Sequence, residues 1–114
     1  MRHCFALDLQ DDADAIARYE AWHRPGAPPE TVTRSIRNAD IRELEIWRVH
    51  DRMFMIMEVG PAFSPQAKAA ADMASEDVQA WETLMWSFQK PLPQAAPGEK
   101  WLAMEKIYAL SEQP

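Results

Sequence analysis

Two side chains capable of proton transfer lie one helical turn apart near the N-terminus. The stretch YEAWHRPG, residues 19–26, places Tyr19 four residues before His23, so a helix would project both from one face. An imidazole with an ordinary pKa near ~6.5 gives or takes a proton at neutral pH, and a phenol beside it can assist. Pro25 and Gly26 end the helix just beyond. The spacing suits acid–base chemistry, although a histidine here more often binds the terminal carbonyls of its own helix.

Other chemistries find less support in the sequence. His3 and His50 make no HxH or HExxH spacing, which argues against a metal site, and there is no phosphate loop. Cys4 is the only cysteine, so no internal disulfide can form, and no neighbour in sequence would activate its thiol. We therefore expect neither a metal centre nor a nucleophilic cysteine.

Composition limits the size and the partners of the protein. A chain of 114 residues, 47% of them hydrophobic, predicts one compact domain over residues 1–114. A net charge of -6 without a basic cluster offers phosphate backbones nothing to bind, so we expect no nucleic-acid partner. No apolar run approaches the ~18 residues of a membrane span, and the N-terminus turns acidic too early for a secretory signal. The expected location is the cytoplasm.

The apolar pattern predicts short strands and helices in alternation. Strands are expected over residues 3–10, 41–49, 52–59 and 101–110, with a tight hairpin at 50–51; helices are expected over 11–24, 28–40 and 64–90, the last with a capped break near 74–77. A Pro-rich loop, residues 91–98, precedes the final strand.

This order is the β-α-β-β-α-β plan of an α+β fold, in which helices cover one face of an antiparallel sheet. The other face of such a sheet would stay bare in a chain this short. Exposed apolar area on that scale marks an association surface, so we expect a homodimer that stacks sheet on sheet or closes a shared barrel.

Three motifs in order resemble the L-rhamnose mutarotase family, and more closely its L-fucose mutarotase branch. They are YEAWHRPG, VQAWETLMWSFQKPLP (78–93) and PGEKWLAMEKIYAL (97–110), and the resemblance runs from about residue 3 to 110. It implies a ferredoxin-like dimeric α/β barrel that interconverts the α and β anomers of a six-deoxy sugar without metal or organic cofactor. It also implies that His23 and Tyr19 are catalytic and that Trp81 contacts the sugar.

Further residues are expected around the sugar. Glu82 and Met85 accompany Trp81 on the same helix, and the apolar face of a sugar packs well on an indole. Aromatic and Met residues at helical spacing are usually core, so Trp86 is expected either to line the pocket or to pack inside. Trp22, Trp47 and Trp101 are expected to serve packing.

A carboxylate on a strand could accept a sugar hydroxyl or the proton of His23. Glu105 and Glu58 are the candidates, and Glu105 is preferred because it lies in the third motif. The competing interpretation for both is an ion pair at the rim of the barrel.

Two departures from the family pattern bear on the sugar. Members of the rhamnose branch tend to carry a second tryptophan where this chain has Glu82, and a tyrosine where it has Leu44. These changes favour L-fucose over L-rhamnose. An L-rhamnose mutarotase, a monooxygenase-like or haem-handling enzyme of the same fold, and a non-catalytic sugar-binding module remain as alternatives.

Overall fold

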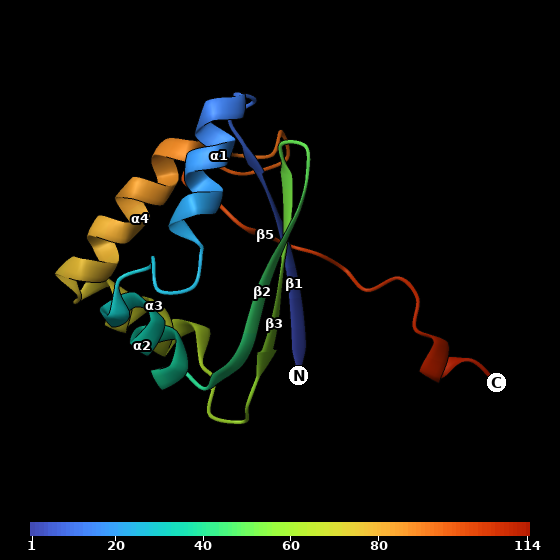
Figure 1. Cartoon of the computed structure of the whole chain (residues 1–114). Coiled ribbons are helices and arrows are strands. Elements are labelled where there is room, and N and C mark those ends of the chain that lie inside the picture. The colour runs from blue at the N-terminus through green and yellow to red at the C-terminus, as the bar shows by residue number, and fades with distance from the viewer.

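A computed structural model describes residues 1–114 as one antiparallel sheet covered on one face by four helices (Figure 1). The elements in chain order are β1 (Arg2–Leu9), α1 (Ala13–Trp22), α2 (Glu30–Asn38), β2 (Ile41–Val49), β3 (Arg52–Val59), α3 (Pro65–Met73), α4 (Glu76–Phe88), β4 (Gln89–Lys90), β5 (Leu102–Ala103) and a short 3-10 helix, Leu110–Glu112. The strand order is β2-β3-β1-β4, and β5 also pairs with β1. No helix is both long and apolar enough to cross a membrane.

The predicted β-α-β-β-α-β plan is confirmed, and local chemistry explains where its helices begin. Asp12, Ser64 and Ser75 cap α1, α3 and α4, and each accepts a hydrogen bond from a backbone N–H of the first turn. The predicted break between α3 and α4 lies at this last cap. β2 and β3 have the predicted bounds and are joined by a tight turn in which His50 has a positive φ of 50°.

The predicted final strand over 101–110 is wrong for most of its length. Only Leu102 and Ala103 pair with β1, after which one further hydrogen bond joins the Met104 N–H to the Cys4 carbonyl. Beyond that the chain leaves the sheet on the side opposite the helices (Figure 1). The predicted helix over 64–90 also ends earlier, at Phe88, because Gln89 and Lys90 pair with β1 as β4.

The helix layer and the sheet pack through two separate apolar clusters. The larger cluster joins β1 and β3 to α1 and α4, with Leu7 and Met53 almost fully buried at its centre. The smaller cluster joins β2 and β3 to α2 around Ile41, Met57 and Val59. Between the clusters the helices do not fill the space above the sheet, and this gap forms the candidate site described below.

The other face of the sheet carries apolar side chains that no helix covers. Trp47, Phe54, Ala6 and Leu102 lie in register across four neighbouring strands, and Trp47 is 61% exposed. The segment after β5 adds Ile107, which is 93% exposed. The expected bare face is therefore present, and Trp47 does not pack inside the subunit as the sequence led us to expect.

One tight junction sets where β2 begins and therefore where its cavity-facing residues lie. Asp40 occupies the left-handed region at φ 63°, its carbonyl accepts from the Gly60 N–H at 2.8 Å, and its carboxylate accepts from the Ala62 N–H at 2.9 Å. The Asp40 carboxylate also lies against Gly60 where any Cβ atom would stand. Glycine fits there as Asp40 stands, whereas a methyl group would overlap the carboxylate and force it to shift.

Gly60→Ala is expected to lower the free energy of unfolding by about 1–3 kcal/mol, because the added methyl must displace the Asp40 carboxylate. Urea denaturation measures the loss. In an Asp40→Ala background the same substitution should cost clearly less, since the clash is gone. Equal losses of unfolding free energy in both backgrounds would show that the Asp40 carboxylate is not what disfavours a side chain at Gly60.

Candidate active site

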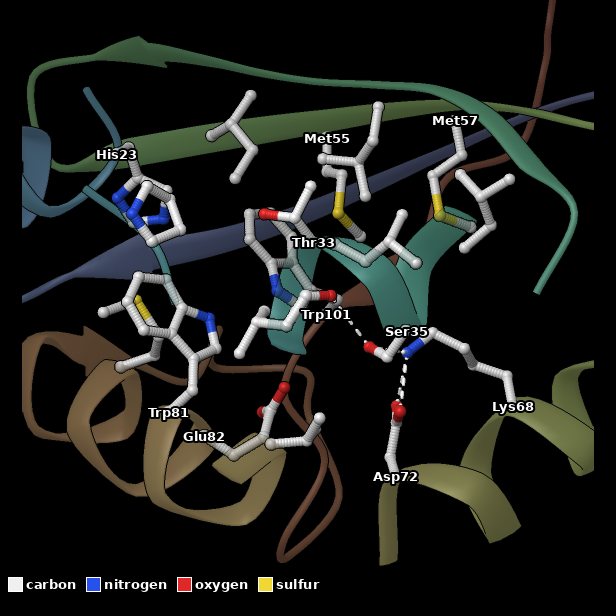
Figure 2. A pocket seen from close by; sticks show the side chains of 18 of the residues that line it. His23, Thr33, Ser35, Met55, Met57, Lys68, Asp72, Trp81, Glu82 and Trp101 are labelled. Carbon is white, nitrogen blue, oxygen red and sulfur yellow. Dashed lines mark hydrogen bonds and ion pairs between the residues drawn. The ribbon is translucent and has the colours of Figure 1, made fainter. Parts of the chain in front are cut away.

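A cavity of about 380 Å³ lies between the two apolar clusters, above the inner face of the sheet (Figure 2). This volume is in the range of small-molecule sites. Its walls are mostly apolar and include Leu44, Met55 and Met57 from β2 and β3. His23 and the group of Ser35, Lys68 and Asp72 mark its two ends, and the polar side chains of Thr33 and Glu82 lie between them (Figure 2).

His23 stands at one end of the cavity, directly after α1. Its backbone N–H caps the helix by donating to the Glu20 and Ala21 carbonyls. Its Nδ1 lies 2.7 Å from the carbonyl oxygen of Tyr19. A carbonyl can only accept, so Nδ1 carries the proton in the neutral ring and Nε2 keeps its lone pair. The helix-terminal contact expected of such a histidine is thus present, and it leaves Nε2 available to a ligand.

Burial sets the protonation state of the imidazole. It lowers the pKa of His23 below the ordinary value of 6.5, because the charged ring would lose its hydration, and the hydrogen bond to the Tyr19 carbonyl opposes this only in part. At neutral pH the ring is therefore a neutral base.

Tyr19 lies beside His23, with 4.4 Å between the ring centroids, and is only 4% exposed. Burial raises the pKa of Tyr19 to about 12, helped by the nearby Glu82 carboxylate and opposed by a hydrogen bond from Gln89. The Gln89 Nε2 donates to the phenol oxygen at 3.1 Å, so the hydroxyl proton is free for another acceptor. At neutral pH the pair therefore presents a base and an acid side by side.

Aromatic rings from two distant segments complete this end of the cavity. Trp81 on α4 meets His23 edge-on, at 5.6 Å between centroids, and Trp22 in turn packs edge-on against Trp81 at 6.0 Å. Trp101, just before β5, lies on the wall beyond them (Figure 2). Trp22 thus packs on Trp81 but stays 39% exposed, and Trp101, also expected to serve packing, lines the cavity.

The remaining predicted residues of α4 divide between cavity and exterior. Met85 and Glu82 line the cavity together with Trp81. The Glu82 carboxylate accepts from the Lys100 ammonium at 2.9 Å, and the same ammonium lies over the Trp86 ring at 4.8 Å. Trp86 is not part of the cavity wall, and it serves to hold Lys100 and the loop after α4.

Neither strand carboxylate reaches the cavity. Glu58 forms an ion pair with Arg2 at 3.2 Å and lies near the N-terminal ammonium, which is the rim ion pair considered above. Glu105 is exposed on the segment that leaves the sheet, at a different hollow beside Glu58 and Tyr108. The expectation that Glu105 contacts the sugar finds no geometric support within one subunit, because the final strand that would have placed it does not form.

The far end of the cavity carries polar residues that the sequence reasoning missed. Lys68 and Asp72 of α3 form an ion pair at 2.6 Å, and the Lys68 ammonium also lies 3.5 Å from the Ser35 hydroxyl of α2 (Figure 2). Their i,i+4 spacing was visible in the sequence, but such pairs are common on solvated helices. Only the packing of α3 against α2 and α4 turns them inward. No three His, Cys, Asp or Glu side chains cluster closely enough to hold a metal ion.

The geometry therefore shows a cavity of small-molecule size with a neutral imidazole beside an un-ionised phenol, and the comparisons with known proteins identify the class of protein. The family model described as L-rhamnose mutarotase matches residues 2–110. The L-fucose mutarotase of Xanthomonas campestris pv. campestris is 54% identical over 111 residues, covering 97% of this chain and 89% of the relative. The chain belongs to the L-rhamnose mutarotase family and is a carbohydrate mutarotase.

Solved structures confirm the fold. The L-rhamnose mutarotase of Formosa agariphila superposes with a TM-score of 0.68 at 14% identity, covering 96% of this chain and 98% of that one. Tetracenomycin F2 cyclase of Streptomyces glaucescens, a type-II polyketide cyclase, superposes with a TM-score of 0.53 at 17% identity, covering 96% and 95%. The fold is thus the ferredoxin-like α/β-barrel type. Because a cyclase shares it, the fold alone does not specify the reaction.

An NMR titration of the imidazole signals should give His23 a pKa below about 6.5, with the proton of the neutral ring on Nδ1. Long-range nitrogen–proton correlation spectra distinguish the two tautomers, and His23→Ala assigns the signals. A pKa above 6.5 would contradict the effect of burial on the imidazole, and a proton on Nε2 would contradict the hydrogen bond to the Tyr19 carbonyl.

Proposed function

We propose that the protein interconverts the α and β anomers of L-fucose, with His23 and Tyr19 as its catalytic residues. The observation that carries this proposal is the juxtaposition of a neutral imidazole and an un-ionised phenol on one cavity wall. Mutarotation needs one group to take a proton from the anomeric hydroxyl and another to give one to the ring oxygen. The geometry supports that division of labour.

In the proposed reaction Nε2 of His23 takes the proton of the anomeric hydroxyl while the Tyr19 hydroxyl gives its proton to the ring oxygen. The bond between C1 and the ring oxygen breaks, and C1 becomes an aldehyde. The phenol can act as an acid despite its pKa of about 12, because the leaving alkoxide is a stronger base than a phenolate. After rotation about the C1–C2 bond the ring closes on the other face of the aldehyde, and both protons return.

The rate acceleration that this site has to supply is modest. Mutarotation already proceeds slowly in water, so a positioned acid and base contributing roughly 10²–10⁴-fold can supply most of the acceleration. The indole of Trp81, edge-on to His23, offers an apolar surface for one face of the sugar ring. Few polar groups are then needed beside the reacting oxygens.

Two features favour L-fucose over L-rhamnose. The similar enzyme from Xanthomonas campestris, at 54% identity, is an L-fucose mutarotase. The two positions at which this chain departs from the rhamnose branch, Leu44 and Glu82, both face the cavity. They change the groups that meet the sugar hydroxyls, while His23 and Tyr19 are kept.

His23→Ala should lower the enzyme-catalysed anomer exchange of L-fucose by roughly 10²–10⁴-fold, because Nε2 is the proposed base. Saturation-transfer NMR on equilibrated L-fucose, with L-rhamnose in parallel, measures the exchange. His50→Asn, on the exposed hairpin, is the matched control and should keep full activity. Undiminished exchange in His23→Ala would remove this residue from the mechanism.

Tyr19→Phe should lower the same exchange and leave the cavity shape intact, since only the hydroxyl is lost. Tyr108→Phe, at the one other tyrosine of the chain, is the control and should behave like the wild type. If Tyr19→Phe kept the wild-type rate constant, the ring oxygen would have to receive its proton from another donor.

We also propose that the protein is a homodimer joined through the bare sheet face. Trp47, Phe54 and Leu102 supply a continuous apolar surface, and the exposed Ile107 and Leu110 extend from its edge. Surfaces of this kind are rarely left in water. A second copy stacked on the sheet would cover it, and the C-terminal segment could then lie along the partner.

Sedimentation of the native protein should give twice the subunit mass of 13.1 kDa. Trp47→Asp combined with Phe54→Asp places charges in the proposed interface and should yield a monomer, whereas Ala17→Asp on the exposed side of α1 should remain dimeric. A monomeric wild-type protein at micromolar concentration would contradict the interface.

A further inference from the structure

Stability alone does not account for the position of the ion pair between Lys68 and Asp72. The two side chains are only 19% and 22% exposed, and both border the cavity. An exposed i,i+4 pair adds little to a helix, and partial burial makes such a pair more costly because both charges lose water. No residue of α3 belongs to the buried core. The contribution of α3 to the inner side of the fold is therefore this polar pair.

The hydrogen-bonding capacity of the pair is not used up. The Lys68 ammonium has three donors, which reach the two Asp72 oxygens at 2.7 and 2.6 Å and the Ser35 hydroxyl at the long distance of 3.5 Å. The Ser35 hydroxyl donates to the Val32 carbonyl at 2.9 Å, so its oxygen can still accept. The Asp72 carboxylate keeps free lone pairs. A neighbouring hydroxyl group could donate to Asp72 and accept from Lys68 in place of the long contact with Ser35.

The position of the pair in the cavity selects which hydroxyls it meets. Figure 2 shows His23 and Trp81 at one end and Ser35, Lys68 and Asp72 at the other. A pyranose whose C1 faces His23 turns the opposite side of its ring, C3 to C5, toward the second end. In a six-deoxy hexose C5 carries a methyl group in place of a hydroxymethyl group. The hydroxyls that remain on this side are those on C3 and C4.

We propose, resting on the mutarotase activity proposed above, that Lys68 and Asp72 bind the C3 and C4 hydroxyls and thereby determine which sugar is accepted. The opposite charges of the pair cancel, so it suits a neutral polyol rather than a sugar acid or a sugar phosphate. L-Fucose and L-rhamnose differ in configuration at C2 and C4. The pair would therefore contact the hydroxyl on C4, one of the two carbons at which these sugars differ.

The test compares L-fucose with its 4-deoxy and 2-deoxy analogues in saturation-transfer NMR. In the wild type, loss of the C4 hydroxyl should lower kcat/KM by roughly 10- to 100-fold, as expected for a hydrogen bond to a charged group. Lys68→Met should lower kcat/KM for L-fucose and 2-deoxy-L-fucose by a similar factor and lower it clearly less for the 4-deoxy analogue, which has only the C3 contact to lose. The loss should appear mainly in KM, because the contact is made in the ground state as well.

Asp72→Asn, a nearly isosteric change, should show the same selective loss, and the urea midpoints of both variants verify that they fold. Arg34→Met removes a comparable i,i+4 pair with Glu30 from an exposed part of α2 and should keep the wild-type preference. If Lys68→Met and Asp72→Asn discriminate between the sugars as the wild type does, the assignment is wrong while the mutarotase activity stands. If the wild type does not accelerate the anomer exchange of any aldose, both the proposed function and this assignment are wrong.

Discussion

The hydrogen bond between Nδ1 of His23 and the carbonyl of Tyr19 is the constraint on which the site depends. It fixes the imidazole at the end of α1, determines which nitrogen carries the proton, and turns Nε2 into the available base. Because the acceptor belongs to the backbone of Tyr19, the same contact fixes the proposed base relative to the phenol proposed as the acid. The histidine that satisfies the helix terminus is thus also the residue proposed as the catalytic base.

The rest of the fold keeps a space open in front of that pair. Two apolar clusters hold the helices on the sheet, one around Leu7 and Met53 and the other around Ile41 and Met57, and the cavity is the region that neither fills. Burial in this region moves the two pKa values apart, downward for His23 and upward for Tyr19. Divergent pKa values in neighbouring groups are what acid–base catalysis at neutral pH requires.

The sequence predicted β1, β2 and β3, the capped break between α3 and α4, and the meeting of Tyr19, His23 and Trp81, because local patterns and an ordered set of motifs determine them. It did not predict the inward position of Lys68 and Asp72. An alanine-rich helix with an i,i+4 ion pair is typical of an exposed helix, and only the packing of α3 against its neighbours places this pair at the cavity. It also extended the last strand past Ala103, where the chain leaves β1 although that strand continues to Arg2: strand propensity is a weak guide, because tertiary context decides whether a segment joins a sheet. The placement of Glu105 failed for that same reason.

The central claim is that neutral His23 acts as the base in anomer exchange, and the pH dependence of kcat/KM for L-fucose tests it most directly. The profile should rise with pH through a single ionisation whose pKa lies below about 6.5 and matches that of His23 in the free enzyme, since protonation removes the lone pair on Nε2. Activity should be lost as the pH falls through that pKa. A profile that is flat across this range, or that falls as the pH rises, would contradict the account.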